Sequence, residues 1–478
     1  MKKVRTRFAP SPTGFMHLGG LRTALYAYLY AKHNGGDFIL RIEDTDQQRY
    51  VEGAVELIYS SLKESGLYYD EGPDVGGDCG PYVQSQRKEI YAKYAKKLIE
   101  LGGAYYCFCS KERLESLTDE NGNRKYDKHC LSLPKEEVER RLAAGEPYVI
   151  RQNIPTEGTS TYEDMIYGTI TVDNSELEDN ILIKSDGMPT YNFANVIDDH
   201  LMGITHVIRG TEYLSSTPKY NLMYDAFGWE RPVYIHLPTI MKDATRKLSK
   251  RYGDANFDDF VKKGYLKEAI INYVALLGWA PKNNVEKMTV PEMVELFSLD
   301  GISKSPSIFD EVKLRWLNGE YIRELSDEDF YALAKPYLES SDINGLFDLE
   351  KAAKLLHGRT EVLGEIPEKI NWLAKLEKYD PALFFNKKNK TDENFAREIL
   401  PKIRKYIEEV PAFDNDTLYQ YIGGKCAEEG IKAGAAFWIM RIAITGQAVT
   451  PGGATEMASL LGREETLKRL DFSIRMLG

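Results

Sequence analysis

The first forty residues of the chain hold a strand–helix–strand pattern that limits the fold more than any other feature. Residues 4–8 alternate like a short strand, and residues 38–42 form a second apolar run. Between them, a loop rich in proline and glycine precedes residues 18–32, where leucines recur at helical spacing. Two strands joined by a helix of this length pair in parallel with a right-handed crossover. We therefore expect a parallel α/β sheet at the start of the chain.

The rest of the chain divides into regions of different pattern. A length of 478 residues exceeds one hydrophobic core, so two to four domains are expected. Polar, strand-rich stretches and a charged helix interrupt the α/β pattern, and parallel-sheet character returns at residues 181–184 and 205–209. The chain is helical almost throughout after about residue 257. The expected domains are a split α/β domain (1–84 and 184–241), an inserted α+β domain (85–183), a following segment (242–325) and an all-helical region (326–478).

Composition excludes several classes of protein. No apolar run approaches the roughly 18 residues of a membrane span, and the basic N-terminus lacks the apolar segment of a secretory signal. Five cysteines are too few for a disulfide framework and fit a reducing cytoplasm. The net charge of -11 argues mildly against a nucleic-acid partner, although local patches decide such binding.

The segment His17-Leu18-Gly19-Gly20 lies where the proline-rich loop enters the first helix. A helix N-terminus presents unpaired N–H groups and the positive end of a dipole, and glycine lets a nucleotide approach the backbone. His17 could donate to phosphate oxygens there. Taken alone, a histidine near a helix start is more often a cap or a surface residue.

A basic segment at residues 242–251 holds five lysines and arginines and the single acid Asp243. By itself, such a run is usually a solvated helix face. Lys247 and Lys250, three residues apart on a loop, could instead reach a polyphosphate from one side. His17 and its helix end would then hold the nucleotide from the other side.

Both segments resemble signatures of class I aminoacyl-tRNA synthetases, and the closest resemblance is to the bacterial-type glutamyl-tRNA synthetases. Residues 17–20 resemble the "HIGH" signature and residues 247–251 the "KMSKS" signature. Residues 7–14 (RFAPSPTG), 41–46 (RIEDTD) and 186–209 also resemble that branch, as do residues 248–279 and 440–470. One departure is Gly20, which stands where the general signature has a second histidine; the glutamyl branch tolerates this change.

The resemblance implies a two-step ligase that uses ATP with Mg²⁺ and attaches L-glutamate to tRNA(Glu) through glutamyl-adenylate. His17, Lys247 and Lys250 are the expected catalytic residues. The expected ATP-binding residues are His17, Gly19, Gly20, Glu212, Tyr213, Lys247, Leu248, Ser249 and Lys250. The expected glutamate-binding residues are Arg7, Ala9, Ser11, Glu43, Tyr191, Asn195 and Arg209. Arg7 and Arg209 would bind carboxylates and Glu43 the ammonium group; each alone would more often be an ordinary ion pair.

A structural zinc site is a further expectation. Cys107, Cys109 and Cys130 would supply three ligands, with Tyr126 as fourth ligand and His129 as the second choice. The cysteine and tyrosine pattern resembles the one through which some members of that family bind zinc in the insertion. The alternative to a zinc site is three reduced, buried cysteines without metal.

The resemblance also implies an architecture and a set of alternatives. The α/β domain would be a Rossmann-type catalytic domain, residues 85–183 would contact the tRNA acceptor end, residues 242–325 the stem, and residues 326–478 the anticodon. We expect a cytoplasmic monomer. A non-discriminating enzyme that also charges tRNA(Gln) stays open, with Arg359 near the region that decides it. A catalytically inactive tRNA-binding module is the alternative from another class, and a short paralogue without an anticodon region does not fit this length.

Overall fold

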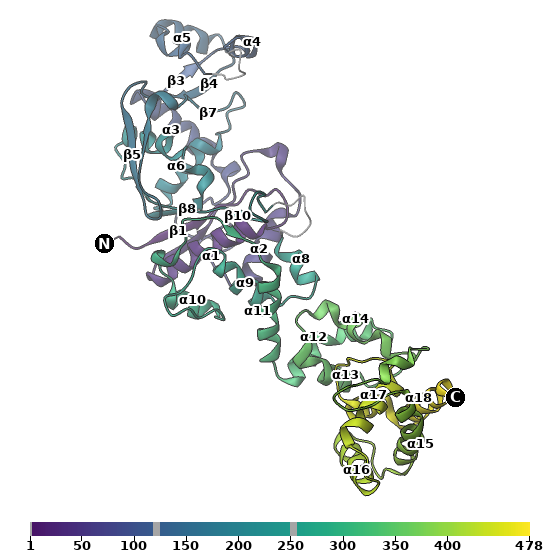
Figure 1. Cartoon of the computed structure of the whole chain (residues 1–478). Helices are drawn as coiled ribbons and strands as arrows, with labels where there is room; N and C mark the ends of the chain where they lie inside the picture. The colour runs from purple at the N-terminus through teal and green to yellow at the C-terminus, as the bar shows by residue number, and fades with distance from the viewer. Residues whose placement is uncertain (1, 118–124, 249–255) are drawn as a thin grey trace. The chain divides into compact units, whose positions relative to one another are not determined.

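The computed structural model describes residues 2–117, 125–248 and 256–478, which form two compact units (Figure 1). The N-terminal unit comprises Met1–Phe260 and Ile270–Asp310, and the C-terminal unit comprises Val261–Ala269 and Glu311–Gly478. The described strands are β1 (Arg5–Phe8), β2 (Asp37–Leu40), β3 (Ala104–Cys107), β4 (Val149–Gln152), β5 (Thr159–Asp164), β6 (Gly168–Asp173), β7 (Ile181–Ile183), β8 (His206–Gly210), β9 (Val233–Leu237), β10 (Ile240–Met241) and β11 (Ser307–Ile308).

The helices follow the expected change from a mixed to a helical region. In chain order they are α1 (Leu18–His33), α2 (Ala54–Glu64), α3 (Lys88–Glu100), α4 (Lys111–Glu115), α5 (Lys135–Ala143), α6 (Tyr191–Leu201), α7 (Thr217–Phe227), α8 (Phe257–Lys262), α9 (Lys267–Leu276), α10 (Val290–Leu296), α11 (Glu311–Arg323), α12 (Asp327–Glu339), α13 (Leu349–Leu356), α14 (Ile366–Ile370), α15 (Glu393–Glu409), α16 (Asn415–Glu428), α17 (Ala433–Thr445) and α18 (Ala454–Leu477). None of them, over the residues described, is long and apolar enough to cross a bilayer.

The opening strand–helix–strand pattern is confirmed. β1 and β2 pair in parallel, with Arg7 opposite Ile39, and α1 connects them. The backbone N–H of Thr205 donates to the carbonyl of Arg5 at 3.0 Å, which places the start of β8 beside β1. Leucines of α1 pack into the core because they recur on one side of the helix. The parallel strands therefore end at one edge, where ligands bind in open α/β sheets.

A four-stranded sheet with the order β6–β5–β9–β8 forms the second part of this unit. β8 and β9 are parallel and in register, with Arg209 opposite His236, and β5 joins β9 in parallel at the Asp164–Tyr234 pair. β5 and β6 lie within residues 85–183, yet β5 pairs with β9 on the other side of the predicted boundary. The boundaries of the inserted domain stay a prediction.

A three-stranded antiparallel sheet, β3–β4–β7, lies within the predicted insertion. The parallel character expected at residues 181–184 is wrong, because β7 pairs antiparallel with β4. A short apolar strand does not encode its direction, which is set here by a partner thirty residues earlier in the chain.

The C-terminal unit is helical in all the described elements from α11 onward, so the fold class is confirmed. Figure 1 shows α15–α18 gathered at the C-terminal end. Buried aliphatic side chains of α12, α13, α15, α17 and α18 form one continuous core. α18 is kinked at Gly462, whose positive φ of 79° suits glycine.

Candidate active site

His17 is the N-cap of α1, and its geometry fixes the imidazole. Its Nδ1 accepts the backbone N–H of Gly19 at 3.0 Å. In the neutral ring the proton therefore sits on Nε2, which acts as a donor at the positive end of the helix. A Cβ at Gly19 would lie 3.3 Å from His17 Nδ1, so glycine leaves room for this cap. The arrangement suits the binding of phosphate oxygens.

The chain lies beside the first signature soon after the second one, because Asn256 forms a bridge with His17. Leu248 donates its N–H to the carbonyl of Ile240, and Lys247 forms a bridge with Met241, so a hairpin precedes the segment. On the far side, the N–H of Phe257 donates to Met16 O at 3.2 Å. Residues 256 and 257 therefore lie beside the N-terminus of α1. The predicted residues Ser249 and Lys250 lie outside the described residues.

Six charged side chains form a buried cluster at the ends of β1, β2 and α6. Three arginines face three carboxylates: Arg7, Arg41 and Arg87 with Glu43, Asp198 and Asp199. The cluster is electrically neutral, which makes the burial of so many charges tolerable.

Asp199 contacts two arginines of this cluster, Arg7 in β1 and Arg41, which directly follows β2. Arg7 holds it through Nε and Nη2 at 3.0 and 3.2 Å, and Arg41 Nη1 donates at 2.7 Å. Burial opposes ionisation of Asp199, but the two guanidinium groups outweigh it and lower its pKa. Arg7 thus has a carboxylate partner within the chain, and its predicted role toward a ligand carboxylate stays a prediction.

Glu43 presents one carboxylate oxygen to the cluster. Its Oε1 accepts from Arg41 Nη2 at 2.9 Å and from Gln84 Nε2 at 3.4 Å, and the side chain borders a small hollow together with Ser11. Burial raises the pKa of Glu43, against the opposing effect of Arg41. A carboxylate in this setting gains from a cation that replaces lost hydration, as an ammonium group would do.

Arg209 is a buried cation of a different kind. Only 5% of its surface is exposed, yet among the described residues no carboxylate lies within ion-pair distance of it. Its guanidinium carbon lies 4.9–5.4 Å from the ring centres of Tyr213, Tyr220 and Tyr234. Aromatic faces stabilise the charge in part. An anion from a ligand would complete the neutralisation.

Tyr191 is close enough to Glu43 and to Arg209 for both charges to act on it. Burial raises its pKa well above the usual value; the negative charge of Glu43 adds to this rise, and Arg209 opposes it. Its ring lies 5.3 Å from that of Tyr213. Asn195, one turn later on α6, is buried and donates to Tyr191 O at 2.6 Å. An acid and an arginine that both act on Tyr191 suit a zwitterion with a second carboxylate.

The remaining predicted residues lie on neighbouring loops. Ala9 is half-buried and Ser11 is exposed after β1, and Glu212 and Tyr213 belong to the short turn after β8. Gly20 lies within the first turn of α1. Their roles toward ATP and glutamate stay predictions.

The three cysteines expected at a metal site lie together. The Sγ atoms of Cys107, Cys109 and Cys130 are within 4.8 Å of one another, next to the β3–β4 sheet. The hydroxyl of Tyr126 lies 3.3 Å from Cys107 Sγ and 3.4 Å from Cys109 Sγ. His129 is exposed, so the structure favours Tyr126 over His129 as fourth ligand.

The surroundings of the cluster favour a thiolate at Cys107. Arg151 Nε donates to Cys107 Sγ at 3.3 Å, and Arg113 Nη1 donates to Cys109 Sγ at 3.6 Å. The hydrogen bond from Cys130 lowers the pKa of Cys107 to about 4, and the same contact raises the pKa of Cys130. Three sulfurs and one oxygen at this spacing fit tetrahedral zinc.

Sequence reasoning missed several charged residues around the predicted glutamate-binding residues. Asp198 and Asp199 form an acidic pair among the buried residues of helix α6, a signal that could have located the ion cluster. His236 in the apolar strand β9 and Asp164 at the end of β5 were also missed. A lone histidine in a strand is more often a core residue, so sequence alone gives it little weight.

The comparisons with known proteins assign the chain to a family. Residues 3–316 match the family model described as tRNA synthetases class I (E and Q), catalytic domain, and residues 329–474 match an anticodon binding domain. The chain belongs to the class I tRNA synthetases for E and Q.

Its relatives cover the whole chain. A glutamate–tRNA ligase of Clostridium botulinum (strain Eklund 17B / Type B) is 57% identical and covers 100% of this chain and 99% of the relative. One from Clostridium tetani is 56% identical, with coverage of 99% and 98%. A crystal structure of a glutamate tRNA ligase from Elizabethkingia meningosepticum in complex with its amino acid has a TM-score of 0.90 at 36% identity and covers 100% of both chains.

Proposed function

We propose that this protein is a glutamate–tRNA ligase that joins L-glutamate to tRNA(Glu) with ATP. The observation that carries the proposal is the pair of buried charged residues, Glu43 and Arg209, that both act on Tyr191. The pair offers an acid for the ammonium group and a buried arginine, without a carboxylate partner among the described residues, for the side-chain carboxylate. Relatives named glutamate–tRNA ligase at 57% and 56% identity support it independently.

The first step activates glutamate. An oxygen of its α-carboxylate attacks the α-phosphorus of ATP, the bond to the β-phosphate oxygen breaks, and pyrophosphate leaves with its electron pair. His17 Nε2–H and the N-terminus of α1 bind phosphate oxygens from one side. Lys247 and Lys250 neutralise the leaving pyrophosphate from the other side. ATP enters with Mg²⁺, which offsets phosphate charge.

The second step transfers the amino acid. A hydroxyl of the terminal adenosine attacks the carbonyl carbon of glutamyl-adenylate, and AMP leaves. No enzyme nucleophile takes part, so positioning and charge neutralisation supply the catalysis. The ATP site comprises Gly19, Gly20, Glu212, Tyr213, Leu248 and Ser249 beside the catalytic residues.

The glutamate site combines Arg7, Ala9, Ser11, Glu43, Tyr191, Asn195 and Arg209. Arg209 gives selection against glutamine, because a neutral amide leaves a buried guanidinium uncompensated. Such a loss amounts to about 1–3 kcal/mol or more.

Cys107, Cys109, Cys130 and Tyr126 are proposed to hold one structural zinc ion, which would stabilise the region around β3 and β4. The enzyme is proposed to act as a cytoplasmic monomer. Its proposed domains keep the divisions 1–84 with 184–241, 85–183, 242–325 and 326–478.

The charging of tRNA transcripts tests the proposal. Purified protein is incubated with ATP, Mg²⁺ and labelled glutamate, glutamine or aspartate, with glutamate and glutamine tRNA transcripts in separate reactions. The expected result is glutamate on tRNA(Glu). Glutamate on both transcripts would identify the non-discriminating form. Binding of tRNA without charging of either transcript would overturn the proposal and leave an inactive tRNA-binding module.

A further inference from the structure

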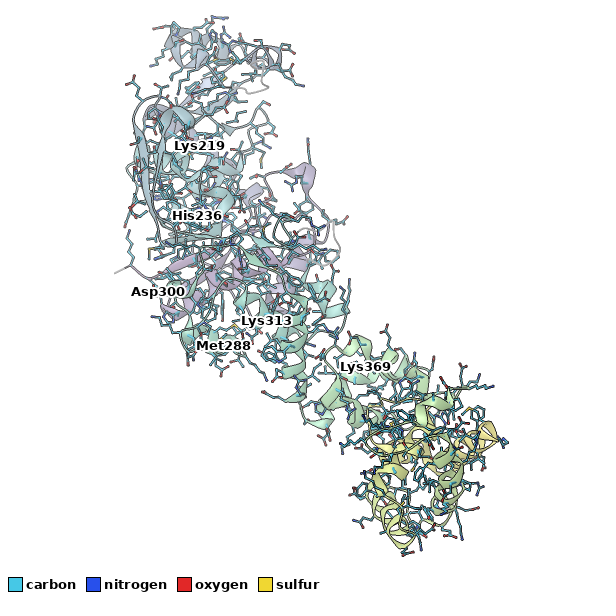
Figure 2. All side chains as sticks on the ribbon, in the orientation of Figure 1. Lys219, His236, Met288, Asp300, Lys313 and Lys369 are labelled. Carbon is cyan, nitrogen blue, oxygen red and sulfur yellow. The ribbon has the colours of Figure 1, made fainter. Side chains whose placement is uncertain are left out.

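Three neighbouring strands place Asp164, His236 and Arg209 in a line across one sheet. Arg209 and His236 are register partners on β8 and β9, and β5 carries Asp164 beside the same strand. All three side chains are buried, and those of Asp164 and His236 are 0% exposed. His236 is labelled in Figure 2, at the level of β8 in Figure 1. The function described above assigns no role to Asp164 or His236.

Asp164 is rigidly held as an acceptor. Its Oδ1 accepts the backbone N–H groups of Ile166 and Tyr167, both at 2.9 Å, in the turn between β5 and β6. Its Oδ2 accepts the backbone N–H of His236 at 3.1 Å and the ring Nδ1 at 2.6 Å. An ionised carboxylate has only acceptors, so the proton of this last bond belongs to His236 Nδ1.

The protonation of Nδ1 determines what His236 offers to Arg209. Burial lowers the pKa of His236, which favours the neutral ring. With the proton on Nδ1, Nε2 carries a lone pair and accepts from Arg209 Nε at 3.1 Å. If the ring proton were on Nε2 instead, the N–H groups of His236 Nε2 and Arg209 Nε would face each other.

Thr217 contacts the same edge of the Arg209 guanidinium as His236 does. Its Oγ1 donates to Tyr213 O at 2.8 Å and accepts from Arg209 Nη2 at 2.7 Å. The edge formed by Nε and Nη2 is therefore used within the protein. The other edge, formed by Nη1 and the second hydrogen of Nη2, has no hydrogen-bond partner among the described residues.

We infer that Asp164 and His236, together with Thr217, are positioning residues that fix the guanidinium of Arg209 so that its Nη1–Nη2 edge faces the side-chain carboxylate of glutamate. The inference rests on the proposed function, which makes Arg209 the partner of that carboxylate. Orientation matters because a bidentate arginine–carboxylate pair needs both N–H groups in one plane with both oxygens. Asp164 acts at a distance, through the ring form that it imposes on His236.

Two substitutions at His236 separate this role from simple packing. In His236→Asn, the side-chain amide can still donate to Asp164 but is too short to accept from Arg209. In His236→Gln, the amide oxygen can take the place of Nε2 and accept from Arg209. Both variants are polar amides of similar bulk in the same buried site. The inference predicts that Gln restores function lost in Asn.

Asp164→Asn tests the ring form directly. An amide NH₂ that faces His236 would make Nδ1 the acceptor and move the ring proton to Nε2, against Arg209 Nε–H. This variant removes one charge and little volume. His206→Asn, a half-buried histidine at the start of β8, is the matched control for loss of a histidine in the same sheet.

The experiment measures KM for glutamate, KM for ATP and kcat in tRNA charging by the full-length protein, with the melting temperature of each variant. His236→Asn and Asp164→Asn are expected to raise KM for glutamate about tenfold or more while KM for ATP stays within about twofold; His236→Gln and His206→Asn stay near wild type. Equal KM for glutamate in His236→Asn and His236→Gln would overturn the inference. So would equal rises in both KM values, which a structural role alone produces.

Arg209→Lys separates this inference from the function on which it rests. If Arg209→Lys raises KM for glutamate but His236→Asn does not, only the positioning role fails. If Arg209→Lys leaves KM for glutamate unchanged, the proposed glutamate site itself fails.

Discussion

The backbone N–H of Phe257 donates to the carbonyl of Met16 at 3.2 Å, one residue before the N-cap of α1. This bond places Phe257, which follows the basic segment 242–251 by six residues, beside the residue that precedes His17. The proposed phosphate chemistry needs positive groups on both sides of the reacting phosphorus, and His17 and the basic segment are proposed to supply them.

Substitution of His17 tests the phosphate role without removal of the helix cap. Asparagine is a good N-cap and can accept the N–H of Gly19, but it lacks the donor at Nε2. His17→Asn is expected to keep the stability of the fold within about 1 kcal/mol. Its kcat for tRNA charging should fall about 10²–10³-fold, the usual effect of losing one transition-state donor. His33→Asn, on the last turn of the same helix, is the control; an equal loss there would contradict the account.

Glu43→Gln should separate stability from substrate binding. Burial raises the pKa of Glu43 in the folded state, so its ionised form is less favourable there than in the unfolded chain. The neutral form of Glu43 stabilises the fold at pH values below the pKa of Glu43 in the unfolded chain. This contribution is lost as the pH rises through the pKa of Glu43 in the folded state. At neutral pH the neutral glutamine should therefore leave the melting temperature unchanged or higher.

The same variant removes the proposed partner of the substrate ammonium group. A hydrogen bond to a charged group contributes about 1.5–3 kcal/mol, so KM for glutamate should rise about 10–100-fold. Glu52→Gln, an exposed site, serves as control. A lower melting temperature together with an unchanged KM would show that Glu43 is only structural.

Substitution of Asp199 should lower the stability of the fold at neutral pH, in contrast to substitution of Glu43. Arg7 and Arg41 outweigh burial and lower its pKa, so its contribution is present above the unfolded pKa and is lost as pH falls through the folded pKa. Asp199→Asn leaves two buried arginines without that partner and should cost about 3–5 kcal/mol. Thermal melts at neutral and acidic pH measure this, with the exposed Asp78→Asn as control. Equal melting temperatures of Asp199→Asn and Asp78→Asn would show that the buried charged cluster does not stabilise the fold through Asp199.

The metal content of the purified protein tests the cysteine site. One zinc per chain is expected by elemental analysis. Cys130→Ser should lose the metal, whereas His129→Ala should keep it, because His129 is exposed and Tyr126 contacts two of the sulfurs. Loss of zinc in His129→Ala would instead make His129 the fourth ligand. Wild-type protein without zinc would contradict the metal site and support the alternative of three reduced cysteines.

Features that depend on neighbouring residues were accessible from the sequence. The opening strand–helix–strand unit follows from leucine spacing and from proline and glycine signals within forty residues. Strand β1, Arg5–Phe8, lies within the predicted residues 4–8. The direction of β7 was not accessible, because it depends on pairing with a distant strand.

The charged network was accessible only in part. The resemblance assigned Arg7, Glu43 and Arg209 to the site, but not the partners that hold them. Asp199 reaches Arg7 across 192 residues of sequence, and His236 reaches Arg209 only because β8 and β9 are neighbours in register. Such partners become visible only after the sheet order is known.

The most direct test of the central claim compares glutamate with glutamine in wild type and Arg209→Gln. The measured quantity is the ratio of kcat/KM for the two amino acids in charging of tRNA(Glu). The account predicts that Arg209→Gln loses most activity toward glutamate and that the ratio falls by about tenfold or more, because the cation that selects the side-chain carboxylate is gone. An unchanged ratio, with glutamate still preferred, would contradict the account and place recognition of the carboxylate elsewhere.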